Sequence, residues 1–150
     1  MTDYKLLTKK MKSLLSKDDN IISNLSNASA LINMHMENIN WVGFYILNND
    51  CLELGPFQGK IACTKLSLDK GVCAKAVRND DTIIVDNVHN FIGHIACDSD
   101  SNSEIVVVLH KDNRIYGVLD IDSPLLSRFS LVDKIGLEEV VCAIENTLNI

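Results

Sequence analysis

Apolar residues recur at steps of three and four near both ends of the chain, which is the spacing of an amphipathic helix. Two such patterns follow each other at the amino end, over residues 4–15 and 21–36, and lysines separate the apolar positions of the first. A third covers residues 130–148, where Asp133 stands three residues after a serine, as in a capping box. Cys142 is expected on the apolar face of this last helix, as inert packing.

The apolar runs between these helices are short and bounded by turn residues, which is typical of β-strands. Residues 41–47 and a segment beginning near Cys51 are joined by Asn-Asn-Asp, and this predicts a hairpin. Further strands are expected at residues 61–68, 82–85, 105–109 and 115–121, and a short helix at 71–77. Helices at both ends around hairpin-connected strands indicate an α+β domain with an antiparallel sheet.

Alternation divides the first of these strands into two faces of different kinds. One face carries Val42, Phe44 and Ile46. This apolar face is expected in the core. The other carries Trp41, Gly43 and Tyr45, two aromatics with polar tips around a glycine that would leave room for a ligand. Ordinary core packing of both aromatics is the alternative.

The same alternation in the last strand places two acids on one face. Val118, Asp120 and Asp122 point one way, and Leu119 and Ile121 point the other. On a half-exposed strand such acids commonly form a solvated face. Alternatively, they enter one cavity with Glu104, which stands at the end of a neighbouring strand. At least one carboxyl would then have a raised pKa, because like charges cannot all ionise together, and it could donate a proton at neutral pH.

Composition narrows the classes of protein to consider. The 150 residues, 47% of them hydrophobic, fit one domain over residues 1–150. A net charge of -6 disfavours nucleic-acid binding, which requires clustered Lys and Arg. The longest apolar run, residues 105–109, is far too short to cross a bilayer, and no run of signal-peptide length follows the amino-terminal lysines. We therefore expect a cytoplasmic protein without a membrane segment.

Residues 86–104 form a long polar loop, and loops of this length inside a compact domain are either functional or disordered. The loop also contains apolar residues, namely Phe91, Ile92, Ile95, Ala96 and Cys97. They favour packing against the sheet over disorder. Cys97, with polar neighbours, has the most reactive setting of the five cysteines, followed by Cys63. Cys73, in the short helix, is either a reactive thiol or a small buried hydrophobe.

Five cysteines without a Cys-x-x-Cys pair match neither a secreted disulfide framework nor a structural zinc site. A catalytic pair of Cys97 with His89 or His94 is conceivable, but no residue is marked as its orienting group. The same three residues lack a familiar metal-ligand spacing, so no metal is expected.

Seven segments of the chain share a pattern with a known family. They are Asn40-Trp41-Val42-Gly43-Phe44-Tyr45, Leu54-Gly55-Pro56-Phe57-Gln58-Gly59-Lys60, Ala62-Cys63, Gly71-Val72-Cys73, Gly93-His94-Ile95-Ala96-Cys97-Asp98, Ser103-Glu104-Ile105-Val106 and Gly117-Val118-Leu119-Asp120-Ile121-Asp122-Ser123-Pro124. Together they resemble the free methionine-(R)-sulfoxide reductases, which are built on a GAF domain. Two departures, Ala74 for a glycine and Ile61 for a frequent proline, touch no reacting group.

The resemblance implies a GAF-like antiparallel sheet flanked by N-terminal and C-terminal helices. It also implies an enzyme that reduces free L-methionine-(R)-S-oxide to L-methionine, with no bound cofactor and with thioredoxin as the electron donor. Matched by motif, Cys97 would attack the sulfoxide, Cys63 would resolve the sulfenic acid, and Cys73 would be an auxiliary thiol that relays the disulfide.

The same resemblance implies that Glu104, Asp120 and Asp122 hold the substrate's α-ammonium and supply a proton, while Trp41 and Tyr45 wall the S-methyl side. One rival is a non-catalytic GAF domain that senses a small ligand, which would not need an attacking and a resolving cysteine. Another is a domain that forms a homodimer through its terminal helices, and this is compatible with catalysis.

Overall fold

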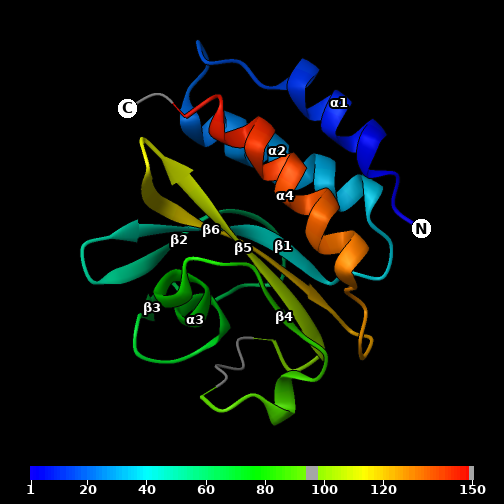
Figure 1. Ribbon diagram of the computed structural model, residues 1–150, viewed down its shortest axis with the longest axis vertical. Coiled ribbons are helices and arrows are strands. Elements are labelled where there is room, and N and C mark those ends of the chain that lie inside the picture. Colours follow the sequence, from blue (N-terminus) through cyan, green and yellow to red (C-terminus); the bar gives the residue numbers. More distant parts are fainter. Residues whose placement is uncertain (94–97, 149–150) are drawn as a thin grey trace.

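One antiparallel sheet of six strands forms the centre of the computed structural model, which describes residues 1–93 and 98–148 (Figure 1). Its strands are β1 Trp41–Asn48, β2 Cys51–Gly59, β3 Lys65–Ser67, β4 Ile83–Val85, β5 Ser103–Lys111 and β6 Arg114–Ser123. They lie in the order β3-β2-β1-β6-β5-β4. Strands β1 and β2 form one hairpin and β5 and β6 another, and pairing of β1 with β6 joins the two hairpins at the centre of the sheet.

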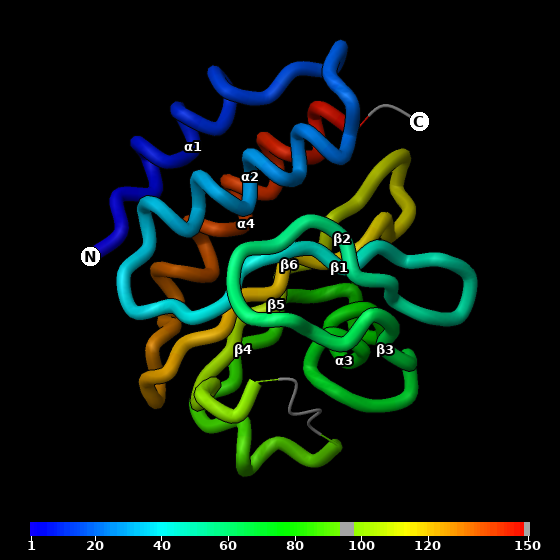
Figure 2. The backbone as a smooth tube through the Cα atoms, turned by 180° about the vertical axis from the view of Figure 1, so that it is seen from behind, coloured from blue at the N-terminus to red at the C-terminus, as the bar shows by residue number. Residues whose placement is uncertain are grey.

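Helices cover the two faces of the sheet unequally. They are α1 Tyr4–Leu14, α2 Ile21–His35, α3 Val72–Asn79 and α4 Leu131–Glu145, with a short 3-10 helix at Val88–Asn90. Helices α2 and α4 pack on one face and α1 packs outside them, whereas α3 packs on the other face against β5 and β6 (Figures 1 and 2). The predicted α+β fold with terminal helices beside an antiparallel sheet is confirmed. Within the described ranges, none of the helices is long and apolar enough to cross a membrane.

Side-chain caps determine where the terminal helices begin. Asp3 and Asn20 accept backbone hydrogen bonds at the starts of α1 and α2. At the start of α4 the backbone N of Ser130 donates a 2.8 Å hydrogen bond to Asp133 Oδ2. This bond belongs to the predicted capping box. Tyr4 Oη donates a 2.6 Å hydrogen bond to Asp133 Oδ1. One acid therefore both caps α4 and ties it to α1.

The sheet separates two hydrophobic cores, and the alternation of β1 decides which side chains enter each. Val42 and Phe44 belong to the larger core beneath the terminal helices. Trp41 and Tyr45 belong to the smaller core beneath α3, which also contains Cys73. The four β1 side chains are at most 3% exposed. The predicted division of β1 into two faces is confirmed.

Two other expectations are wrong in detail. Strand β3 covers Lys65–Ser67 instead of residues 61–68, because it is an edge strand that pairs with β2 alone, and Ile61 lies outside this ladder and is 89% exposed. Cys142 is exposed. It stands two residues before the buried Ile144, which places it about 200° around the helix from the apolar face.

Candidate active site

The antiparallel register brings three acids from two strands together. Glu104 on β5 is paired with Asp122 on β6, and Asp120 lies two residues along β6 on the same face. On the other side of β6, the β1 residues opposite Asp120 and Asp122 are Gly43 and Trp41. All of these positions lie on the face of the sheet that borders the smaller core, so the three acids point toward α3.

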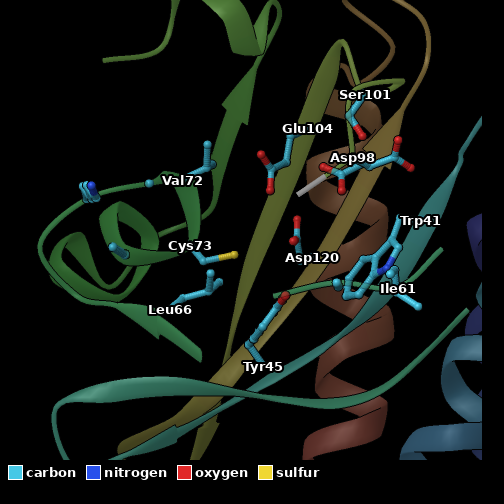
Figure 3. Close-up of a pocket in the computed structure, with 15 residues that line it drawn as sticks. Trp41, Tyr45, Ile61, Leu66, Val72, Cys73, Asp98, Ser101, Glu104 and Asp120 are labelled. Atoms are coloured by element: carbon cyan, nitrogen blue, oxygen red, sulfur yellow. The ribbon is translucent and has the colours of Figure 1, made fainter. Parts of the chain in front are cut away.

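A pocket lies between this part of the sheet and the start of α3 (Figure 3). In Figure 3 the carboxyls of Glu104 and Asp120 and the sulfur of Cys73 point toward one another from three different elements. The lining includes these predicted site residues: Trp41, Tyr45, Cys73, Glu104, Asp120 and Asp122. Tertiary structure therefore brings together the acids, the aromatics and one of the cysteines.

The acids of the pocket are largely removed from water. Glu104 is 5% exposed and Asp120 is 6% exposed, so the interpretation of Asp120 as part of a solvated face is wrong, because α3 covers it. Burial raises the pKa of Glu104 well above its usual value, and the charges of Asp120 and Asp122 raise it further. Burial also raises the pKa of Asp120, against hydrogen bonds to Glu104 and Cys73 that lower it. The pKa of Asp122 is raised mainly by burial and then by the charges of Asp120 and Asp98.

Cys73 lies in the first turn of α3, with its thiol among the acids. Its side chain is 5% exposed, and Sγ lies within 4.8 Å of oxygens of Glu104 and Asp120. Burial, followed by the negative charge of Asp120, raises the pKa of the Cys73 thiol well above its usual value. The predicted burial of Cys73 is confirmed, but its acidic neighbours make it part of the pocket as well as of the core.

Trp41 and Tyr45 form the aromatic wall of the pocket, and Phe57 stacks on Trp41 outside the lining. The centre of the Trp41 ring is 5.9 Å from that of Tyr45 and 5.2 Å from that of Phe57. Trp41 Nε1 donates a 3.1 Å hydrogen bond to the backbone O of Lys60. A Cβ at Gly43 would overlap the Cβ of Phe57 and lie 2.8 Å from Trp41 Cη2. Gly43 therefore makes room for the aromatic stack, which corrects the expectation that it makes room for a ligand.

Cys63 is half-buried and disulfide-bonded. The free thiols among the described cysteines are Cys51, Cys73 and Cys142. Tyr45 Oη donates a 2.9 Å hydrogen bond to the backbone O of Cys63. The pocket wall thus holds the segment between β2 and β3. Cys97, the predicted nucleophile, and His94, a candidate partner for it, lie outside the described residues.

The described part of the loop between β4 and β5 packs partly against the protein. Val88 is fully buried and Phe91 is half-buried, whereas Ile92 is 96% exposed. His89 Nε2 shares a 2.9 Å hydrogen bond with Asn102 Oδ1 on the exposed side of the loop. His89 is not in the lining of the pocket, so the structure gives no support to its pairing with Cys97 or to a metal site that includes it.

Polar residues for which the sequence predicted no role close one end of the pocket. Asn40 Nδ2 donates hydrogen bonds to Asp98 Oδ2 and Ser101 Oγ, and each of these bonds is 3.0 Å long. Asp98 and Ser101 both line the pocket. Nearby, Lys60 Nζ lies 2.6 Å from Asp100 Oδ2 in an exposed ion pair. The run of Asp and Ser was a visible signal, but packing decides which of these side chains turn inward.

The pocket has the chemistry of a cation-binding and proton-donating site. Asp120 Oδ1 is buried without a hydrogen-bond partner among the described residues. An unsatisfied buried acceptor costs about 1–3 kcal/mol, more when it is charged, and a bound ammonium or metal cation would offset this cost. A carboxyl with a raised pKa also keeps its proton to a higher pH than usual, so the acid cluster can act as a general acid.

Comparison with known proteins gives closely similar relatives. No protein-family model matches the chain. The free methionine-R-sulfoxide reductase of Escherichia coli is 45% identical over 145 residues, which cover 97% of this chain and 88% of that protein. The free methionine-R-sulfoxide reductase of Saccharomyces cerevisiae is 44% identical over 129 residues, which cover 81% of this chain and 72% of that protein.

Solved structures agree over almost the whole chain. Structures of fRMsr of Staphylococcus aureus in the reduced form and in complex with substrate have TM-scores of 0.95 and 0.94 at 50% identity, and cover 99% of this chain and 97% of that chain. A structure described as a GAF domain has a TM-score of 0.91 at 38% identity, and the match covers 98% of this chain and 88% of that chain. The sheet, its helices and the pocket under α3 thus define a GAF domain. Within that class, the chain belongs to the family of the free methionine-R-sulfoxide reductases.

Proposed function

We propose that this protein reduces free L-methionine-(R)-S-oxide to L-methionine. The observation that carries the proposal is the cluster of buried Glu104 and Asp120 with half-buried Asp122, in which Asp120 Oδ1 has no hydrogen-bond partner among the described residues. The α-ammonium of a free amino acid would supply the positive charge that this cluster lacks and a hydrogen-bond donor for Asp120 Oδ1. The names of the relatives and the substrate complex of the Staphylococcus aureus protein support the same reaction.

The aromatic wall accounts for the other end of the substrate. With the ammonium at the acids, Trp41 and Tyr45 offer apolar ring surface to the S-methyl group. A methionine sulfoxide inside a peptide has a neutral amide where the free amino acid has its ammonium. The acids would then stay buried without a cation, and the peptide would be rejected.

We assign the attack on the sulfoxide to Cys97, which lies outside the described residues. The thiolate of Cys97 attacks the sulfoxide sulfur and ends as a sulfenic acid, because it takes the oxygen and one proton. Cys97 is oxidised by two electrons, and the sulfoxide is reduced by the same two electrons to the thioether of methionine. The proton comes from the acid cluster, in which burial raises the pKa of Glu104 and Asp122 well above their usual values.

Cys63 completes the cycle as the resolving cysteine. Its thiol displaces the hydroxyl of the sulfenic acid, which forms a disulfide and releases water. The disulfide-bonded state of Cys63 supports this role. A dithiol of thioredoxin then reduces the disulfide and is itself oxidised, so we place the protein in the cytoplasm, where thioredoxin is kept reduced. Cys73 is the auxiliary thiol, and its burial slows its exchange relative to an exposed thiol.

A non-catalytic sensor domain is the rival function. A sensor pocket could use the same acids and aromatics, but it has no use for a redox-active Cys63. A homodimer is compatible with either function. Leu131, Val132 and Ile135 at the start of α4 are 64%, 53% and 55% exposed and offer an apolar surface to a second copy.

Turnover with free methionine-(R)-sulfoxide, thioredoxin and thioredoxin reductase tests the proposal. We expect one methionine for each disulfide that thioredoxin reduces. Binding of methionine without any turnover by the reduced protein would support the sensor instead. Sedimentation analysis of the same preparation measures the oligomeric state.

A further inference from the structure

We propose that Cys73, Glu104 and Asp120 also form a binding site for one Zn²⁺ ion, at the place where the substrate's ammonium binds. The thiol sulfur and one oxygen of each carboxyl all lie within 4.8 Å of one another. In a tetrahedral site with bonds of about 2.0 Å to oxygen and about 2.3 Å to sulfur, ligand atoms are about 3.3–3.5 Å apart. Small rotations of three side chains would therefore bring these atoms to zinc-binding distances.

A second observation points to a ligand at the same place. Asp120 Oδ1 is buried and has no hydrogen-bond partner among the described residues, and the side chain as a whole is 6% exposed. Figure 3 shows this carboxyl directed into the space that Glu104 and Cys73 also face. Buried carboxylate oxygens normally have a donor or a cation within reach. A cation in this space would satisfy Asp120 Oδ1 and bridge α3 to β5 and β6.

The donor atoms favour zinc over the harder divalent cations. Mg²⁺ and Ca²⁺ take only oxygen ligands and six or more of them, whereas zinc accepts one thiolate with carboxylate oxygens and four ligands in total. Three protein ligands leave a fourth position, which a water molecule would fill. Val72 and Leu66, both buried, line the same pocket and limit further access of water.

Zinc and the substrate's ammonium would compete, because both need Glu104 and Asp120. This consequence rests on the proposed function, and it makes Zn²⁺ a competitive inhibitor that also holds Cys73 out of disulfide exchange. The binding site itself does not depend on catalysis.

Metal binding is best measured on the full chain with Cys63 in its disulfide, so that Cys51, Cys73 and Cys142 are the free thiols among the described residues. Zn²⁺ affinity is obtained by competition with a chromophoric chelator, and Cd²⁺ reports sulfur coordination through its thiolate-to-metal absorption band. We expect one ion per chain. Cys73→Ser should abolish the band and lower the Zn²⁺ affinity at least about tenfold, since loss of even an outer-shell partner costs about 10- to 100-fold.

The matched controls are Cys142→Ser and Cys51→Ser, which should keep the band and the affinity. Asp120→Asn, which preserves the shape of the side chain, should also lower the affinity at least about tenfold. Circular dichroism shows whether Cys73→Ser folds. If it does not, Asp120→Asn serves as the second variant. A wild-type protein that binds no Zn²⁺, or a folded Cys73→Ser variant with unchanged affinity, overturns the proposal.

Free methionine separates this proposal from the reductase assignment. Methionine should weaken Zn²⁺ binding in proportion to its own occupancy of the pocket. Unchanged Zn²⁺ affinity at saturating methionine would overturn the shared position of ion and ammonium. A protein that binds Zn²⁺ through Cys73 but does not turn over the sulfoxide would refute the reductase function and leave the metal site standing.

Discussion

Glu104 on β5 and Asp122 on β6 are directly paired in the antiparallel ladder, so two carboxyls stand opposite each other on the face of the sheet that α3 covers. Like charges in such a pair destabilise a sheet by up to about 1 kcal/mol even at exposed positions. Here Glu104 is 5% exposed and Asp122 is half-buried, and Asp120 lies next to them on the same face. The acid cluster therefore destabilises this part of the structure, and a cationic ligand would stabilise it.

The acid cluster should make the protein less stable as the pH rises. The folded protein holds the proton of Glu104 to a higher pH than the unfolded chain does, so above the ordinary glutamate pKa of 4.5 it binds more protons than the unfolded chain, and stability falls. Glu104→Gln should be more stable than wild type by an amount that grows as the pH rises above 4.5. Urea unfolding at several pH values measures this, with Glu139→Gln on the exposed face of α4 as the control. A difference that is constant with pH would contradict it.

Substrate selectivity should depend on the free ammonium and on the configuration at sulfur. N-acetylation of methionine-(R)-sulfoxide should lower kcat/KM by about 100-fold or more, because it leaves buried acids unpaired. The S epimer should not be reduced. Asp120→Asn should narrow the difference between the free and the acetylated substrate, chiefly by raising KM for the free one. Comparable kcat/KM values for the two substrates in the wild type would argue against the ammonium site.

The assigned roles of two cysteines predict different defects. Cys97→Ser should form no methionine in a single turnover without thioredoxin, because no thiolate attacks. Cys63→Ser should still form one methionine per chain but should not be recycled efficiently by thioredoxin, because the disulfide cannot form. Methionine is measured after rapid mixing, with Cys142→Ser as the control. A full single turnover by Cys97→Ser would show that another residue is the nucleophile.

Alkylation should reach the free cysteines in order of their exposure. Cys142 is exposed, whereas Cys73 is 5% exposed and its thiol pKa is raised by burial and by Asp120. At neutral pH Cys73 should react more slowly than Cys142, because burial hinders access to its sulfur and the raised pKa lowers its thiolate fraction. Mass spectrometry of the protein after timed treatment with iodoacetamide gives the order. In denaturant the two should react alike, and equal rates in the folded protein would refute the burial of Cys73.

Gly43→Ala should destabilise the fold by roughly 1–3 kcal/mol, because the added methyl group overlaps Phe57 and Trp41 in the aromatic stack. Gly55→Ala on β2 is the matched control. There the closest atom to an added Cβ is the backbone O of Phe44 at 3.2 Å, so a smaller effect is expected. Denaturant unfolding gives the free energies, and equal losses for both variants would show that the stack at Gly43 is not the cause.

The order of residues along the chain was enough to predict several features that the structure confirms. The period of two in β1 separated Val42 and Phe44 from Trp41 and Tyr45, because a strand alternates its side chains whatever it packs against. The capping box at Ser130 and Asp133 was likewise predictable, since it depends on residues three apart.

Tertiary structure alone decided how deeply the acids are buried and what they face. Periodicity assigned Asp120 to a face, but that face lines a pocket only because α3 packs over it. The pairing of Glu104 with Asp122 depends on the register between β5 and β6, and the approach of Cys73 depends on how α3 docks. Such contacts join residues far apart in the chain. A local pattern gives the direction of a side chain, and only the fold gives its neighbours.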